Sequence, residues 1–315
     1  MRALFVRTSG QPAIVADLPT PSPASGDVLI RVKAAGLNPF DNHIASGALE
    51  HFIDHRYPLV LGRDVSGTVE AVGDQTHGFA VGDDVLGHVP FAAPFEVGTI
   101  AEVVVLPVSQ VALKPGGLDF VSAAALPLAG GAARALVDGV DPKAGQVVLV
   151  NGASGGVGRV VVQLLARCGV TVIATASPAT AGRVGELGAT HVIDYTTGSV
   201  AEKVLSLYPE GVDALINLTG WTLDAVPVAA IRAGGVVRTV TQIPDDATIV
   251  ARGLTGGQIM ASPDGRVLAA LAEQAAAGEL QIDVVSVISL DTARSGLDSI
   301  ETGNAHGKVV VDLTL

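Results

Sequence analysis

A glycine-rich run at residues 151–158 has the residue types that bind a nucleotide diphosphate. The run reads Asn151-Gly152-Ala153-Ser154-Gly155-Gly156-Val157-Gly158, follows the apolar stretch 147–150 and opens a second apolar stretch that ends near Arg167. Glycines at such a place let the backbone turn tightly, approach a pyrophosphate and pack a helix against a sheet. The amides and the positive dipole end of that helix attract the phosphates. We predict that all eight residues bind a dinucleotide; a glycine-rich turn in some other α/β protein is the alternative.

The end of the next apolar stretch, 170–175, indicates which dinucleotide binds. A carboxylate there bonds the ribose 2′-hydroxyl of NAD and repels the 2′-phosphate of NADP. Here Ala176 and Ser177 follow, so the position holds no carboxylate. Ser177 leaves room for a 2′-phosphate and offers a hydroxyl. Arg183 either supplies positive charge to that phosphate or is a solvated helix residue. The sequence therefore favours NADPH.

The secondary structure expected around this glycine run changes near residue 118, from short strands to alternating helices and strands. Residues 1–115 contain short segments in which apolar and polar residues alternate with a period near two, and Gly and Asp bound these segments. This pattern predicts a small barrel of mixed strands. From Phe120, helices alternate with apolar strands, which is typical of a parallel, doubly wound sheet with right-handed crossovers. The expected helices of this α/β part are 119–127, 130–139, 157–168, 179–187, 199–206 and 222–232; the expected strands are 146–150, 170–175, 191–193, 213–216 and 235–240. After residue 258 we expect a helix at 265–277, a strand at 284–290, a helix at 292–301 and a closing strand at 308–313 that completes the N-terminal part.

Composition excludes several classes of protein. The 315 residues are 49% apolar and carry a net charge of −12, with the acids spread along the chain, which disfavours nucleic-acid binding. Gly, Pro, Asn and charges interrupt every apolar run before it reaches the length of a membrane span, and the N-terminus lacks the features of a signal peptide. Cys168 is the one cysteine, so no disulfide framework forms. We expect a cytoplasmic protein that binds neither nucleic acid nor membrane.

Further motifs accompany the glycine run in a fixed order. They lie at 35–41, 57–67, 81–85, 125–130, 187–195 and 307–311. Together with the glycine run they resemble the zinc-free branch of the medium-chain dehydrogenase/reductases, the zeta-crystallin-like NADPH:quinone oxidoreductases. The resemblance covers essentially the whole chain.

The resemblance implies a GroES-like β-barrel catalytic domain, residues 1–118 and 259–315, and a Rossmann cofactor domain, residues 119–258, inserted into it. It also implies a cleft between the domains for the nicotinamide and a homodimer formed by the edges of the cofactor sheets. By family position, Ser177 and Tyr195 approach the adenosine 2′-phosphate, and Asn38 and Asp41 lie beside the nicotinamide and the substrate. The chain departs from the family at Ala132, where a threonine often reaches the nicotinamide.

Zinc ligands of the zinc-dependent relatives are replaced in this sequence. Those relatives use a cysteine in an early loop and a Gly-His-Glu motif, whereas this chain has Asn38 and Gly62-Arg63-Asp64. One cysteine cannot build a four-cysteine site either. We predict no metal, and we expect His43, His51 and His55 at the surface or at a cleft rim.

Without zinc, no strong Lewis acid polarises an alcohol or an ordinary ketone. Hydride acceptance then favours quinones and α,β-unsaturated carbonyl compounds. Asn38 and Tyr57 are candidates to contact the acceptor oxygen. The alternative for Asn38 is hydrogen bonding within its loop, and the alternative for Tyr57 is packing in a turn. Asp41 is either a third site residue or the cap of a short helix through His43 to Ser46.

The leading hypothesis is therefore an NADPH-dependent reductase of quinones. An enone, alkenal or enoyl-thioester reductase of the same fold is the enzymatic alternative. An NADPH-binding regulatory protein with little catalysis is an alternative of another class.

Overall fold

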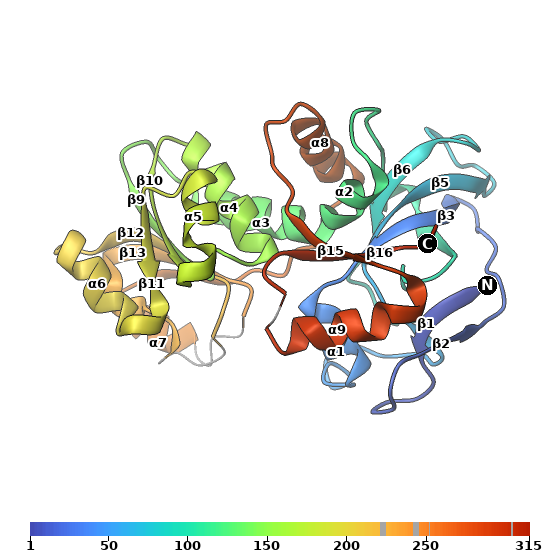
Figure 1. The fold of residues 1–315 in the computed structure, drawn as a ribbon, viewed down its shortest axis with the longest axis horizontal. Coiled ribbons are helices and arrows are strands. Elements are labelled where there is room, and N and C mark those ends of the chain that lie inside the picture. The colour runs from blue at the N-terminus through green and yellow to red at the C-terminus, as the bar shows by residue number, and fades with distance from the viewer. Residues whose placement is uncertain (221–224, 242–245, 252, 304) are drawn as a thin grey trace. The chain divides into compact units, whose positions relative to one another are not determined.

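The computed structural model describes every residue except 221–224, 242–245, 252 and 304 (Figure 1). The chain divides into two compact units. The first, here called the barrel unit, joins Met1–Gly131 to Ser262–Leu315, and the second, the sheet unit, is Ala132–Ala261. The sequence-based boundaries lie at 118 and 259, so the first boundary of the structure falls further along the chain.

Short strands build the barrel unit. β1 (Arg2–Val6) pairs antiparallel with β2 (Ile14–Asp17) and with β4 (Leu59–Val60). The larger sheet has the order β15-β16-β3-β5-β6-β8, and β7 pairs with β3. Its strands are β3 (Asp27–Gly36), β5 (Asp64–Val72), β6 (Asp84–His88), β7 (Val103–Pro107), β8 (Val111–Leu113), β15 (Val284–Ile288) and β16 (Lys308–Asp312). Val311 of β16 pairs with Ala35 of β3, so the C-terminal strand closes the N-terminal sheet as predicted.

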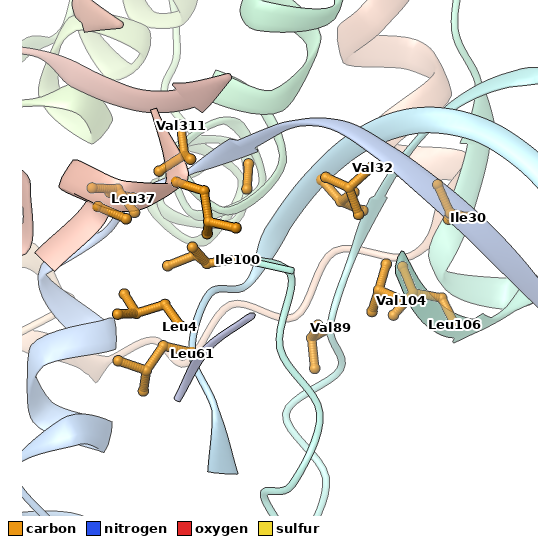
Figure 2. Close-up of a cluster of buried hydrophobic side chains, with 14 of the residues drawn as sticks. Leu4, Ile30, Val32, Leu37, Leu61, Val89, Ile100, Val104, Leu106 and Val311 are labelled. Atoms are coloured by element: carbon orange, nitrogen blue, oxygen red, sulfur yellow. The ribbon is translucent and has the colours of Figure 1, made fainter. Parts of the chain in front are cut away.

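Branched aliphatic side chains from distant segments fill the core of the barrel unit. Figure 2 shows Leu4, Leu37, Leu61 and Ile100 gathered near Val311. Burying one such side chain contributes roughly 1.5–3 kcal/mol. Because Leu37 belongs to this core, the backbone that follows β3 is held in place, and that backbone carries Asn38.

Helix α2 (Phe120–Ala125) explains the position of the first boundary. The side chain of its N-cap residue, Asp119, accepts a hydrogen bond from Ser122 N. Its buried face packs on β3, β5 and β16, and Ala124 and Ala125 share a cluster with Val310. A helix that covers strands of the barrel belongs to the barrel unit. The unit also contains α1 (Pro39–Ala45), α8 (Gly265–Ala276), α9 (Ala293–Glu301) and the start of α3 (Pro127–Val140).

The sheet unit confirms the predicted doubly wound parallel sheet. Its described strands run in the order β11-β10-β9-β12-β13-β14, and all pairs are parallel. They are β9 (Val147–Asn151), β10 (Thr171–Ala176), β11 (His191–Asp194), β12 (Val212–Asn217), β13 (Ile231–Thr239) and β14 (Thr255–Gln258). The strand order reverses between β9 and β12, and open α/β sheets bind ligands at the carboxyl ends of the strands at such a point.

Helices α4 (Gly156–Arg167), α5 (Pro178–Glu186), α6 (Val200–Leu207) and α7 (Asp246–Ala251) complete the sheet unit. Val148, Leu149 and Val150 of β9 are fully buried, as expected for a strand covered on both faces. No described helix in either unit has the length and apolar character needed to cross a membrane.

The helix predicted at 222–232 is wrong in its described part. A 3-10 helix (Val228–Ala230) leads directly into β13 at Ile231, and residues 222–224 lie outside the described residues. Pro227 precedes the 3-10 helix, and proline has no N–H to continue a helix running through it. The sequence also did not predict β14, which pairs with β13.

Candidate functional site

The glycine turn after β9 has a backbone that side chains would obstruct. Gly152 has φ of +88°, a left-handed conformation that favours glycine. A Cβ on Gly158 would collide with the carbonyl oxygen of Gly152 and lie 2.6 Å from Ala153 Cα. Glycine at these two positions therefore lets α4 begin tightly against the turn.

The start of α4 fits a phosphate. The first N–H groups of a helix have no intrahelical partner. The N-cap residue here, Gly155, has no side chain that can accept from them. Backbone donors at a helix N-terminus and the positive end of its dipole attract anions. Gly155 and its neighbours Ser154, Gly156 and Val157 thus suit the pyrophosphate of a dinucleotide.

Buried polar side chains fix this turn to the neighbouring strands. Thr175 Oγ1 accepts a hydrogen bond from Gly152 N at 2.9 Å and donates to Asn151 Oδ1 at 3.0 Å. Asn151 Nδ2 donates to Asn217 Oδ1 at 2.8 Å, and Asn217 Nδ2 donates to Thr241 Oγ1 at 3.0 Å. Both polar atoms of the Asn151 side chain are therefore engaged by neighbouring strands, and this side chain positions the turn.

Ser177 and Tyr195 lie next to each other in the sheet order. Ala176 of β10 pairs with Asp194 of β11, and the two residues directly follow this pair. Ser177 is the N-cap of α5, and its Oγ lies 3.2 Å from Thr180 Oγ1. Tyr195 begins a 3-10 helix (Tyr195–Thr197) and is 52% exposed as a residue. The structure thus places both predicted residues at the carboxyl edge of adjacent strands.

Two cations are relevant to a 2′-phosphate at this edge. Arg183, in the last turn of α5, pairs with Glu186, with 3.1 Å between Nη1 and Oε2. Lys203, which sequence reasoning missed, lies with Nζ 2.7 Å from Asp194 O and 2.6 Å from Thr197 Oγ1. The serine at 199, the N-cap of α6, was the available signal, because it sets the turn on which Lys203 lies.

A second polar group lies in the barrel unit around Asp64, the first residue of β5. Its fully buried carboxylate accepts hydrogen bonds from Leu128 N at 2.8 Å, His88 Nδ1 at 3.2 Å, Asn38 Nδ2 at 3.0 Å and Lys308 Nζ at 3.2 Å. Burial alone raises the pKa of Asp64. The charge of Lys308 and the bonds from His88 and Asn38 outweigh burial and hold this pKa below its usual value. Asp64 is therefore a stable buried anion.

Asn38 and Asp41, two predicted site residues, lie together beside this anion. Asn38 Oδ1 accepts from Lys308 Nζ at 2.7 Å, and Asn38 N donates to Asp41 Oδ2 at 2.8 Å. The latter bond caps α1, which agrees with the helix-cap interpretation of Asp41. Asp41 Oδ1 has no hydrogen-bond partner among the residues that the structure describes.

Burial raises the pKa of Asp41 to about 7. The hydrogen bond from Asn38 and the charges of Arg63 and Lys308 lower it, whereas the charge of Asp64 raises it further. Asp41 therefore exchanges a proton near neutrality, as a proton donor or acceptor in a reaction would.

Arg63 precedes Asp64 and is 2% exposed. Its Cζ lies 4.0 Å from the ring centroid of Phe95, 5.3 Å from that of Phe40 and 5.5 Å from that of Phe91. Nη1 donates to Pro90 O at 3.3 Å, whereas Nε and Nη2 find no acceptor within the described part of the chain. Burial lowers the pKa of Arg63 to about 10, so the guanidinium stays charged at neutral pH.

Tyr57, the third predicted site residue, belongs to a different group. Its hydroxyl donates to Glu50 Oε1, and Glu50 Oε2 accepts from Ser9 Oγ at 2.8 Å. Burial and the Glu50 contact raise the pKa of Tyr57, which makes its hydroxyl a weaker acid. The structure therefore joins Tyr57 to the loop residue Glu50, which agrees with the turn-packing interpretation.

Histidines do not assemble into a metal site in the part of the chain that the structure describes. There, no group of three or more His, Cys, Asp or Glu side chains is arranged to hold a metal ion. His88, which sequence reasoning missed, contacts Asp64 through Nδ1. Its place at the end of β6, directly opposite Asp64 in β5, comes from strand pairing.

Comparisons with known proteins agree with this architecture. Residues 24–116 match the alcohol dehydrogenase GroES-like domain, and residues 187–311 match the zinc-binding dehydrogenase model. The 2-methylene-furan-3-one reductase of Solanum lycopersicum is 33% identical over an alignment of 291 residues, and the match covers 90% of this chain and 71% of the relative.

Two solved structures are also similar. The quinone oxidoreductase of Coxiella burnetii has a TM-score of 0.89 at 28% identity, and the match covers 99% of each chain. The mycobacterial protein Rv1454c, solved in complex with NADPH, has a TM-score of 0.85 at 27% identity, again over 99% of each chain.

Proposed function

We propose that this chain, which belongs to the quinone oxidoreductase branch of the medium-chain dehydrogenase/reductases, uses NADPH to reduce quinones or other electron-poor carbonyl compounds. The observation that carries the proposal is the glycine turn opening α4 next to a strand, β10, that ends without a carboxylate. The turn fits a pyrophosphate, and the strand end accommodates a 2′-phosphate.

NADPH, when bound, supplies the hydride for the reduction. The turn from Gly152 to Gly158 would hold its pyrophosphate, and Asn151 would keep that turn in place through Asn217. Ser177 and Tyr195 would face the 2′-phosphate, with Lys203 nearby on the same edge of the sheet. Arg183 would contribute once its pair with Glu186 opens.

The barrel unit supports a reaction that does not depend on zinc. Asn38 bonds Asp64 and Lys308 with its side chain, and Arg63 carries a positive charge, so neither is available as a metal ligand. A carbonyl compound that is already electron-poor does not require a metal ion to polarise it. Asp41, with its pKa near neutrality, is suited to hold the proton that completes the reduction.

Reduction of an enone is the second candidate function. The similarity to the tomato 2-methylene-furan-3-one reductase, over 90% of this chain, favours it. Both acceptor classes gain negative charge on a carbonyl oxygen, so the same residues would serve either one.

A panel of acceptors tests the proposal. We expect steady NADPH oxidation with 1,4-benzoquinone or 9,10-phenanthrenequinone. Turnover with alkenals or enoyl thioesters alone would assign the enone activity. Saturable NADPH binding without turnover across the panel would indicate a binding protein of the regulatory class.

A homodimer and a cytoplasmic location complete the proposal. Their support is the sequence resemblance and composition described above. Light scattering of the purified chain at micromolar concentration tests the dimer, and a monomeric mass would contradict it.

A further inference from the structure

Lys308 and Arg63, two buried cations of the barrel unit, differ in how fully their N–H groups are used. An ammonium has three donors, and Lys308 Nζ has three acceptors: Leu37 O, Asn38 Oδ1 and Asp64 Oδ2. Arg63 has five donors, and its Nε and Nη2 lack an acceptor among the described residues. Lys308 is thus satisfied by the fold, whereas Arg63 retains binding capacity.

The unused donors of Arg63 form one edge of its guanidinium. In this planar group, the N–H of Nε and one N–H of Nη2 point the same way, which suits one oxygen or a pair of oxygens. Buried donors are nearly always hydrogen-bonded in native proteins. Two unused buried donors therefore require an oxygen from outside the described residues.

Aromatic rings surround the guanidinium of Arg63 and suit a flat apolar ligand. Phe95 is buried, and Phe40 and Phe91 are partly exposed, with their ring centroids 4.9 Å apart. Both partly exposed rings contact the guanidinium, with their centroids 5.3 and 5.5 Å from Arg63 Cζ. A planar acceptor that displaces these two rings would bring its oxygen to Arg63.

We propose that Arg63 is a catalytic residue whose Nε–Nη2 edge binds the acceptor's carbonyl oxygen and stabilises the negative charge that this oxygen gains. This inference rests on the proposed function. The acceptor takes a hydride from NADPH, which becomes NADP⁺, and a π electron pair moves onto the carbonyl oxygen. One proton, from Asp41 or from water, then neutralises the anion. Fixed donors directed at developing charge are among the strongest catalytic devices in proteins.

Replacing the guanidinium separates this role from a structural one. Arg63→Met removes the charge and the edge, and Arg63→Lys keeps the charge without the edge. We expect kcat/KM for the acceptor to fall by about 10²–10³-fold in Arg63→Met, as when one oxyanion donor is removed, and to fall less in Arg63→Lys. NADPH affinity, followed by fluorescence titration, should stay within about twofold of the wild type, since the cofactor residues lie in the other unit.

Lys114→Met is the matched control for loss of a buried cation over an aromatic ring. Lys114 Nζ lies 4.8 Å from the Phe120 centroid in the same unit, and its side chain is 7% exposed. The Lys114→Met variant should have a lower Tm than the wild type and the same kcat/KM for the acceptor. Equal losses of kcat/KM in Arg63→Met and Lys114→Met would overturn the proposal.

Two further measurements test the edge directly, and the first of them does not use Arg63→Met. In Arg63→Ala, millimolar guanidinium should restore turnover, whereas urea and ammonium should not; equal effects of all three would count against the edge. Benzoate, a flat carboxylate that cannot be reduced here, should bind the cofactor-free wild type and not Arg63→Met in titration calorimetry. Equal benzoate binding by both proteins would reject the site. A wild type that reduces no acceptor would reject the proposed function instead, while benzoate binding would still decide the role of Arg63.

Discussion

Lys308→Met removes the buried cation that pairs with Asp64, and its cost can be worked from the structure. Lys308 Nζ loses hydrogen bonds to Leu37 O, Asn38 Oδ1 and Asp64 Oδ2. Hydrogen bonds to charged groups contribute about 1.5–3 kcal/mol each, but methionine avoids the desolvation of an ammonium, which offsets part of the loss. The net cost of breaking a buried ion pair from one side is about 3–5 kcal/mol. We expect the free energy of unfolding to fall by that amount at pH 7.

The pH dependence of this loss identifies its cause. The pKa of Asp64 lies below its usual value in the folded protein. Its stabilising contribution is therefore present above the unfolded pKa of about 3.9 and is lost as the pH falls through the folded pKa. Without Lys308 the folded pKa of Asp64 rises, and the carboxyl takes up a proton at higher pH. The difference between wild type and Lys308→Met should then shrink as the pH is lowered from 7 towards 4.

Urea unfolding followed by circular dichroism measures both effects, and Asp64→Asn completes a double-mutant cycle. The double variant should be more stable than the sum of the single losses predicts, because the uncompensated buried charge is gone. A loss below about 1 kcal/mol in Lys308→Met, or a difference that does not change with pH, would refute the buried ion pair.

Three other substitutions test the cofactor turn, the residue that follows β10 and the buried carboxyl of Asp41. Gly158→Ala should weaken NADPH binding at least about tenfold and lower Tm, since its Cβ would meet Gly152 and Ala153 backbone; unchanged binding in a fluorescence titration would contradict the tight start of α4. Asp41→Asn should gain stability relative to the wild type as pH rises from 5 to 8. Because the pKa of Asp41 is raised to about 7 in the folded protein, the wild type loses stability as the pH rises through that window. The same difference in urea midpoint between variant and wild type at both pH values would disprove this. Ser177→Asp should shift preference from NADPH to NADH, and a variant that keeps the wild-type preference would show that β10 does not select the cofactor.

Local sequence was enough to predict the glycine turn, because Gly152 and Gly158 are demanded by backbone conformation and close packing within a few residues. The end of the strand before Ser177 indicated its role, whereas Tyr195 was assigned from the family resemblance alone. The pairing of β10 with β11 in the structure brings the two residues to one edge of the sheet. The doubly wound sheet also followed from the alternation of apolar strands and helices.

The group around Asp64 could not be predicted in the same way. Lys308 and Asp64 are 244 residues apart, and only the pairing of β16 with β3 and of β3 with β5 brings them together. Arg63 was noted as a replaced zinc ligand, but its aromatic surroundings come from two separate segments, α1 with Phe40 and the loop with Phe91 and Phe95. No local pattern encodes such contacts.

NADPH oxidation with a quinone and with an alkenal, compared with NADH oxidation under the same conditions, tests the central claim most directly. The account predicts turnover with at least one of these acceptors and a higher kcat/KM with NADPH than with NADH. No turnover with either acceptor, or an equal or higher kcat/KM with NADH, would contradict it.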